Sequence, residues 1–468
     1  MFGFLLNLIL TFENNLYVYG NYRDNRYSEV SLNFYIYFII KNIQYSISNT
    51  FKNMDNDKIL KIIESCHFNF LIGSGASRNY LETLSNIETL LTELDKEPRE
   101  IKSEKWYKIL DVSIKYWYYE KCIKGNTKLI DDSFGLCETK QLEFEETQKS
   151  YEDFLQALNI LILKRKNKLL PKEVNIFTTN MDIFLDVTLD NLGLEFNDGF
   201  SGKFMQTFDT SNYQKSFFKN SSQYNLSSEL PLFNLFKLHG SITWDKSSNK
   251  EISYNQKCDV LFKLNEIVLP PEFLAPLTRE IVDAEVTKFL PRNYSDIKTE
   301  CKGKKLEDLD ISQFENFIIE YDKLVMINPT KEKFENTTLR LEYYEQMRMY
   351  ANILERENTV LFVSGFSFAD EHIREITKRA LNSNPTLLII VFSYSDSQKK
   401  YIEELFPKLK YKNLHTDLVG FDFNKVTKSV FLQIAEKFDS TITEKQPVVH
   451  ITVSDNLKAE SKDEEPSK

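Results

Sequence analysis

The chain has 468 residues, of which 42% are hydrophobic and 27% are charged, and it carries a net charge of −10. This composition is typical of an ordered globular protein of roughly two or three domains, or of one large domain with insertions. The negative charge excludes a global field that attracts DNA, RNA or an anionic membrane, so we expect no strong nucleic-acid binding by this chain alone.

The first residues raise a question about where the native chain begins. Residues 1–12 are apolar, but a membrane span needs about 20 residues, so we expect no membrane anchor. Met54 opens a second plausible start, and residues 1–53 are either a native N-terminal extension or the product of a mis-assigned start. We expect a main domain over 54–440 and a disordered tail over 445–468, because this tail is polar and charged.

Four short apolar runs, each ending in small or polar residues and followed by a helical pattern, recur along the chain. The pairs of apolar run and expected helix are 68–77 with 80–94, 174–182 with 183–193, 359–370 with 371–385, and 386–396 with 397–406. Strands apolar on both faces that alternate with helices predict a parallel sheet covered on both sides. The sequence therefore predicts an α/β fold, a Rossmann-like doubly wound parallel sheet.

Two longer intervals depart from this alternation. Residues 86–170 are charged and helical in pattern, and residues 245–320 combine "LPPEFLAP" with mixed charged helices. We expect both to be helical insertions that form a smaller subdomain against the sheet. Ligands of such folds bind outside the carboxyl ends of the strands, where the polar turns meet.

The first two polar turns contain candidate binding residues. In "GSGAS", Gly73 to Ser77, the absence of side chains predicts free amides and a helix N-terminus facing a phosphate, or else a tight turn without ligand. In "TTNMD", the amide of Asn180 can donate and accept at once. Asp182 holds a ligand group or caps the next helix, and Thr178 and Thr179 are expected to form the turn.

The next two turns add a possible base and a second small-residue loop. "KLHGS" places His239 at a strand end, where an imidazole can exchange a proton near pH 7 and Gly240 keeps the approach open; a structural histidine is the alternative. "SGFSFADEHI" offers Ser364, Gly365 and Ser367. The following Asp370 and Glu371 favour the dipole of a helix without any function, and His372 is expected to be structural.

Cysteine and histidine usage predicts no metal site. The chain has five cysteines and five histidines, and neither type forms a C-x-x-C or H-x-x-x-H pair. Scattered cysteines in odd number favour a reducing compartment, so we expect a cytoplasmic protein without a disulfide framework.

Taken in order, these motifs resemble the sirtuin-like NAD-binding family, the fold related to protein deacetylases. "GSGAS" is similar to its first phosphate turn, "TTNMD" to its strand-end Asn and Asp motif, and "KLHGS" to the segment of its catalytic histidine. "VSGFSF" is similar to the turn that lines the ribose, and "YSDSQ" to the loop near the adenosine half. The resemblance implies catalytic roles for Asn180 and His239, and it implies binding of NAD by Gly73, Ser74, Gly75, Ala76, Ser77, Thr179, Asp182, Gly240, Ser364, Gly365, Ser367 and Ser395.

The chain departs from deacetylating sirtuins in one respect. They carry a four-cysteine zinc module after the catalytic histidine, whereas only Cys258 and Cys301 follow His239 here. The sequence motif "GFSFADEHI" is most similar to that of the bacterial branch that acts in anti-phage defence. The resemblance therefore implies an NAD hydrolase that releases nicotinamide and ADP-ribose. An NAD-dependent deacylase or ADP-ribosyltransferase and a non-catalytic nucleotide sensor or scaffold are the alternatives.

The same resemblance implies partners. We expect a homo-oligomer, and a separately encoded HerA-type ATPase, because this chain has no G-x-x-x-x-G-K-[ST] motif of its own. Unchecked destruction of NAD kills the cell, so an infection signal is expected to shift the protein from an inactive to an active form.

Overall fold

The computed structural model describes residues 55–83, 86–165, 167, 169–246, 252–283, 286–326, 341–407 and 410–437. The expected N-terminal extension and the expected tail from residue 445 lie outside these residues. The fold and the site described below belong to one compact unit, Asn56–Lys468.

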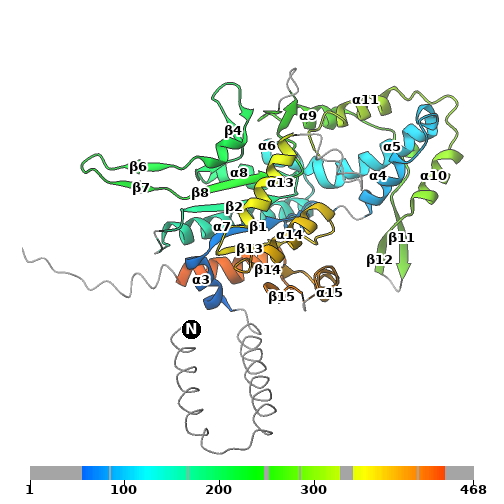
Figure 1. Cartoon of the computed structure of the whole chain (residues 1–468). Helices are drawn as coiled ribbons and strands as arrows, with labels where there is room; N and C mark the ends of the chain where they lie inside the picture. Colours follow the sequence, from blue (N-terminus) through cyan, green and yellow to red (C-terminus); the bar gives the residue numbers. More distant parts are fainter. Residues whose placement is uncertain are drawn as a thin grey trace, which may run out of the picture. The chain divides into compact units, whose positions relative to one another are not determined.

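A seven-stranded sheet forms the centre of this unit, with the order β15-β14-β13-β1-β2-β8-β3 (Figure 1). All neighbouring strands in it are parallel. The strands are β1 (His67–Ile72), β2 (Glu173–Thr178), β3 (Phe196–Asn197), β8 (Leu232–Lys237), β13 (Thr359–Ser364), β14 (Leu388–Ser393) and β15 (Leu414–Val419). The chain runs outward from β1 in both directions, so the strand order reverses between β1 and β13, where such sheets bind ligands.

Helices cover both faces of the sheet, which confirms the predicted doubly wound fold. On one face, Phe68 and Phe70 of β1 contact Phe154 and Phe431, which belong to α7 (Glu138–Leu163) and the π-helical turn η7 (Thr427–Leu432). On the other face, Leu71 shares a core with the helices α13 (Leu341–Leu354), α14 (Glu371–Ser383) and α15 (Asp396–Leu405). Successive strand residues alternate between these two cores, as the period of a strand requires.

Shorter elements complete the sheet side of the unit. The helical ones are α3 (Asn56–Ser65), η1 (Ser74–Ala76), α8 (Phe184–Asn191), η5 (Thr210–Gln214) and α16 (Phe423–Val426). Small antiparallel sheets are formed by β4 (Phe200–Ser201), β5 (Thr207–Phe208), β10 (Ile252–Tyr254) and β9 (Trp244–Lys246), by β6 (Phe218–Asn220) with β7 (Ser227–Glu229), and by β11 (Thr278–Asp283) with β12 (Val286–Pro291). Among the described helices, none has the length and apolar character that crossing a bilayer requires.

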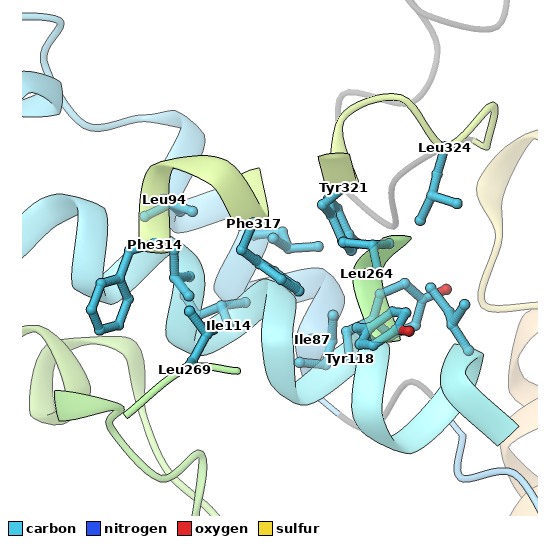
Figure 2. Close-up of a cluster of buried hydrophobic side chains, with 14 of the residues drawn as sticks. Ile87, Leu94, Ile114, Tyr118, Leu264, Leu269, Phe314, Phe317, Tyr321 and Leu324 are labelled. Carbon is cyan, nitrogen blue, oxygen red and sulfur yellow. The ribbon is translucent and has the colours of Figure 1, made fainter. Parts of the chain in front are cut away.

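A second core, here called the helical cluster, joins two segments that are far apart in the sequence (Figure 2). Its helices are α4 (Ile87–Asp95), η2 (Ile101–Ser103), α5 (Lys105–Tyr118), η3 (Tyr119–Ile123), η4 (Lys124–Asn126), α6 (Thr127–Ile130), α9 (Asp259–Glu266), η6 (Pro271–Phe273), α10 (Tyr294–Gly303) and α11 (Ser312–Tyr321). Buried Ile114 and Tyr118 share this core with Leu264, Phe317 and Tyr321. The helix α7, by contrast, packs on the sheet, so the segment 86–170 contributes both to the helical cluster and to the sheet side of the unit. The domain boundaries stay predictions.

Three of the four helices expected after the polar turns are confirmed as α8, α14 and α15. The helix expected over 80–94 is wrong in its first part, because α4 begins only at Ile87. Tyr80 and Leu81 are buried, and the amide of Glu82 donates to the carbonyl of Lys121 at 3.0 Å. Tertiary contacts therefore override the local helical pattern in this segment.

A ladder of four buried asparagines crosses the sheet from β3 to β1 and is here called the asparagine ladder. Nδ2 of Asn197 donates to Asn234 at 3.0 Å, Asn234 to Asn175 at 2.9 Å, and Asn175 to Asn69 at 2.8 Å. Asn69 completes the ladder by donating to the carbonyl of Val360 in β13 at 3.0 Å. These bonds join residues that are paired in the strand register, so a slip of one strand by one residue would leave buried polar groups unpaired.

Candidate functional site

The residues at the carboxyl ends of β1, β2, β8 and β13 meet around one cavity, here called the first cavity. Asn180 and Asp182 follow β2, His239 follows β8, and Gly365 follows β13. The cavity is lined by Ser74, Ser77, Leu81, Glu82, Glu88, Tyr118, Cys122, Thr179, Asn180, Met181, Asp182, His239, Gly365, Phe366, Ser367, Ala369 and Asp370. The sequence therefore correctly predicts that these turns share one edge of the sheet.

A second cavity lies beside the first, toward β14. It is lined by Ser74, Gly75, Arg78, Thr83, Gly365, Ser367, Phe392, Tyr394, Ser395, Gln398, Phe421, Asp422 and Phe423. Ser74, Gly365 and Ser367 line both cavities. The two cavities therefore adjoin along the carboxyl edge of the sheet, from His239 at the end of β8 to Ser395 after β14.

The glycine turn after β1 does not present a row of free amides, which corrects the expectation for "GSGAS". The amides of Gly73 and Gly75 donate to the carbonyls of Ser364 and Gly365 at 3.0 and 2.9 Å. Those of Ala76 and Ser77 bond within the turn, which continues as the three-residue 3-10 helix η1 and not as an α-helix. Buried backbone amides need hydrogen-bond partners. Here they bond to carbonyls of the protein, so they are not available to bind a phosphate.

The glycines of this turn are needed for another reason: they allow two backbone segments to approach closely. A Cβ atom added at Gly75 would lie 2.8 Å from Cα of Gly365, and one added at Gly365 would lie 2.4 Å from the amide nitrogen of Ala76. Gly365 also has a φ of +66°, which side chains disfavour. The glycines therefore hold the ends of β1 and β13 together.

Asn180 projects into the first cavity with part of its amide unsatisfied. Its Nδ2 donates to the carbonyl of Gly73 at 3.2 Å, and its backbone amide donates to Oγ1 of Thr178 at 3.0 Å. Within the described part of the chain, its buried Oδ1 has no hydrogen-bond partner. Such a group costs free energy unless a ligand or water pairs with it. Thr178, which also bonds the carbonyl of Ile72, forms the turn as expected.

Asp182 lies at the end of a buried hydrogen-bond chain. Oγ of Ser77 donates to its Oδ2 at 2.8 Å, and Ser77 in turn bonds the hydroxyl of Tyr151 at 2.9 Å. Burial raises the pKa of Asp182, an effect that Lys237 and the hydroxyl of Ser77 oppose. Lys237 itself is paired with Asp186, with Nζ and Oδ2 2.6 Å apart. Asp182 can therefore accept a hydrogen bond from a ligand amide or, when protonated, donate one.

His239 is almost fully buried and has a carboxylate beside it. Its Nε2 lies 3.1 Å from Oδ2 of Asp370, the residue before α14. The neighbouring Gly240 has a φ of +82°, and an added Cβ would lie 2.4 Å from the carbonyl of Val325. Gly240 thus accommodates a neighbouring segment, which corrects the expectation that it keeps the approach to the histidine open.

Sequence reasoning missed three features of the site. The sequence gives Asp370 a role only at the start of its helix, because nothing in the sequence places it near His239. Arg78 stands beside the second cavity, with its guanidinium carbon 5.1 Å from the centre of the Tyr394 ring. Finally, a wall of the first cavity comes from the helical cluster and its connections, through Glu88, Tyr118 and their neighbours. No local pattern signals a wall that is built from a distant segment.

The other candidate residues have mixed placements. Ser395 caps α15 by accepting from the amide of Gln398 at 3.3 Å and lines the second cavity. Ser364 is buried in β13. Of the residues proposed to bind NAD, those that line neither cavity are Gly73, Ala76, Gly240 and Ser364.

The two cysteines that follow His239 are both buried as free thiols in the helical cluster. Burial raises the pKa of Cys258 and of Cys301, each to about 12. Thiols of this kind behave as small hydrophobic side chains. In the part of the chain that the structure describes, no group of three or more His, Cys, Asp or Glu side chains could hold a metal ion; absence of a metal stays a prediction.

Comparison with solved structures finds weak likeness to Sir2 proteins. One is a triple mutant of a Sir2 homologue in complex with 2′-O-acetyl-ADP-ribose, with 12% identity, a TM-score of 0.34, and coverage of 84% of this chain and 100% of that one. Another is a complex of a Sir2 homologue with NAD, with 12% identity, a TM-score of 0.33, and coverage of 82% and 96%. A search of curated proteins finds no match.

Comparison with protein families gives a more specific result. Residues 320–416 match the family model described as a SIR2-like domain. The matched segment contains β13, the turn with Gly365, Asp370 at the start of α14, and Ser395. The family resemblance that the strand-end motifs predict is thus confirmed over this segment: residues 320–416 are similar to a SIR2-like domain.

Proposed function

We propose that this protein is an NAD hydrolase that cleaves the bond between nicotinamide and ribose. One observation carries the proposal: Asn180, Asp182 and His239 line a single cavity that continues into a second one along the carboxyl edge of the sheet. An amide, a carboxyl and an imidazole are the groups that positioning and proton transfer at a sugar require.

In the proposed complex, NAD binds across these two cavities in one orientation. The nicotinamide and its ribose lie in the first cavity, near Asp182 and His239, and the adenosine lies in the second, near Ser395. Because most amides of the glycine turn are already bonded, the pyrophosphate is left to the amide of Ser74 and the guanidinium of Arg78. Arginine binds phosphate oxygens with paired, charge-assisted hydrogen bonds.

The reaction breaks the bond between C1′ of the ribose and the pyridinium nitrogen, whose electron pair leaves with nicotinamide. The unpartnered Oδ1 of Asn180 is a fixed dipole that can stabilise the oxocarbenium character on the ribose or orient water. His239 takes a proton from the attacking water or from a ribose hydroxyl, and the water oxygen forms the new bond to C1′. Asp182 holds the carboxamide of the leaving group.

Water is favoured as the acceptor over an acylated lysine. The four-cysteine module of deacetylating sirtuins has no counterpart here, and the two later cysteines pack in the helical cluster. That cluster supplies Glu88 and Tyr118 to the wall of the first cavity. Transfer to a protein acceptor remains the alternative that the product analysis distinguishes.

In the cell, we propose that this activity depletes NAD during anti-phage defence. An enzyme that destroys NAD needs an inactive resting state, so assembly into a homo-oligomer or binding of a HerA-type ATPase is the proposed control. Both would act by shifting the population toward a competent form.

Incubation of the purified full chain with NAD, alone and together with a HerA-type ATPase, tests the proposal. Chromatography should detect nicotinamide and ADP-ribose in equal amounts. Asn180→Ala and His239→Gln should each lower the turnover by about 10² to 10⁴-fold, the usual contribution of a positioned acid or base.

Two control variants make the same types of substitution away from the candidate site. His67→Gln replaces a histidine at the opposite end of the sheet, where β1 begins, and Asn316→Ala replaces an exposed asparagine on α11; both should retain full turnover. Release of nicotinamide only with an acylated peptide would establish the deacylase instead. NAD binding without any product under all conditions would establish the sensor.

A further inference from the structure

One carboxylate, that of Asp370, contacts both a helix and the candidate base. Its Oδ1 accepts hydrogen bonds from the amides of His372 and Ile373 at 3.0 and 3.2 Å, which caps α14. Its Oδ2 lies 3.1 Å from Nε2 of His239. Both residues are only 9% exposed, so water screens their interaction weakly.

We propose that Asp370 is a positioning residue that sets the tautomer of His239 for NAD cleavage; this role rests on the proposed hydrolase function. The contact between Oδ2 and Nε2 is a short Coulombic one. An ionised carboxylate has only acceptors, so it disfavours a lone pair on Nε2, and the neutral imidazole keeps its proton there. The lone pair then resides on Nδ1, and this nitrogen takes the proton from the nucleophile. Asp370 lines the first cavity as well, but in this role it acts through His239 and not on the reacting atoms.

The loop that carries Asp370 is held in a demanding conformation. Phe368 is fully buried and has a φ of +59°, which is unfavourable for a residue with a side chain. Nη1 of Arg374 bonds the carbonyls of Phe368 and Ala369 at 3.0 and 3.1 Å. Strain that the surrounding structure maintains is a feature of functional loops, and here it places the carboxylate against His239.

Because Asp370 also caps α14, the substitution Asp370→Asn distinguishes a role in setting the tautomer from a role in capping. In Asp370→Asn, the side-chain oxygen must keep accepting from the two amides of α14, so the NH₂ group takes the position of Oδ2 and faces Nε2. A donor at that position forces the proton of His239 onto Nδ1, which removes the base. Serine also caps helices well, but its short side chain places no donor beside the ring.

The order of the kinetic effects therefore tests the proposal. We expect kcat to fall slightly in Asp370→Ser and by about 10² to 10⁴-fold in Asp370→Asn, with the KM for NAD and the melting temperature of the Asn variant unchanged. A purely structural cap predicts the reverse order, because asparagine replaces aspartate at caps with little loss. Asp209→Asn, the same change at the cap of η5, is the control and should keep full kcat.

Nitrogen-15 NMR of the imidazoles tests the same contact without any turnover. The chain has five histidines, and the signal that His239→Gln removes identifies His239. We expect a proton on Nε2 in the unsubstituted protein and on Nδ1 in Asp370→Asn. An unchanged tautomer together with an unchanged kcat overturns the proposal. If the unsubstituted protein releases no nicotinamide under any condition, the hydrolase function fails, while the tautomer still decides whether Asp370 controls His239.

Discussion

Replacing the central member of the asparagine ladder by alanine is expected to lower the free energy of unfolding by about 4 kcal/mol. Asn175 donates to Asn69 and accepts from Asn234, so Asn175→Ala leaves one buried acceptor and one buried donor without partners. Each such group costs about 1–3 kcal/mol. Asn197→Ala removes the same atoms at the end of the ladder. It leaves one buried group unpaired, Oδ1 of Asn234, together with the partly buried carbonyl of Lys215, which water can reach, so it should cost roughly half as much.

Urea unfolding followed by circular dichroism measures both variants. Because the two substitutions remove the same atoms, the difference between them reports the buried donor Nδ2 of Asn234, which only Asn175→Ala leaves unpaired, and should be about 1–3 kcal/mol. Equal destabilisation by Asn175→Ala and Asn197→Ala would refute the reasoning, since it would mean that the ladder bonds contribute nothing beyond the volume of the side chains.

Three further predictions concern the two strand-end turns and a buried acid. Gly365→Ala places a Cβ atom 2.4 Å from the amide nitrogen of Ala76, so it should lower the melting temperature and NAD cleavage, whereas Gly135→Ala, where the added atom meets nothing within 4 Å, should change neither. Burial raises the pKa of Asp198 to about 6; the folded protein therefore holds this proton more tightly than the unfolded chain, and stability falls as the pH rises from about 4 to 6, by at most about 3 kcal/mol. Chemical unfolding across this range should show the fall in the unsubstituted protein and not in Asp198→Asn. Arg78→Ala should raise the KM for NAD by about tenfold with kcat retained, because it removes a charge-assisted phosphate contact.

Each of these predictions has an opposing outcome. Full cleavage by Gly365→Ala would show that the close contact of the two turns is dispensable. Parallel pH profiles of the unsubstituted protein and Asp198→Asn would show that Asp198 titrates as an exposed acid does. A fall in kcat at constant KM in Arg78→Ala would place the guanidinium at the reacting end of NAD and not at the pyrophosphate.

Local patterns predicted the elements of the sheet side well. The apolar runs that became β1, β2, β13 and β14 are buried on both faces, and this is the condition under which a short apolar run becomes a central strand. The helix after Asp370 was predicted as well, because its cap is a local signal.

The sequence could not give contacts between distant segments. The free amides expected in the glycine turn are consumed by Ser364 and Gly365, and the pairing of Asp370 with His239 depends on the arrangement of β8 and α14. Neither contact can be predicted from the spacing of residues in the sequence, since each joins the ends of two separate strands. The wall that the helical cluster contributes to the first cavity could not be predicted for the same reason: Glu88 and Tyr118 lie on helices that precede β2 and belong to no strand end.

The position of β13 beside β1 has a consequence for how the protein is made. The chain through β8 carries Asn180 and His239, but it lacks the carbonyls that bond the glycine turn and the carboxylate of Asp370. Because domains assemble as they leave the ribosome and distant strands pair last, an unfinished chain cannot complete the site. If the protein cleaves NAD, the cell that synthesises it is exposed to that activity only from nearly complete chains.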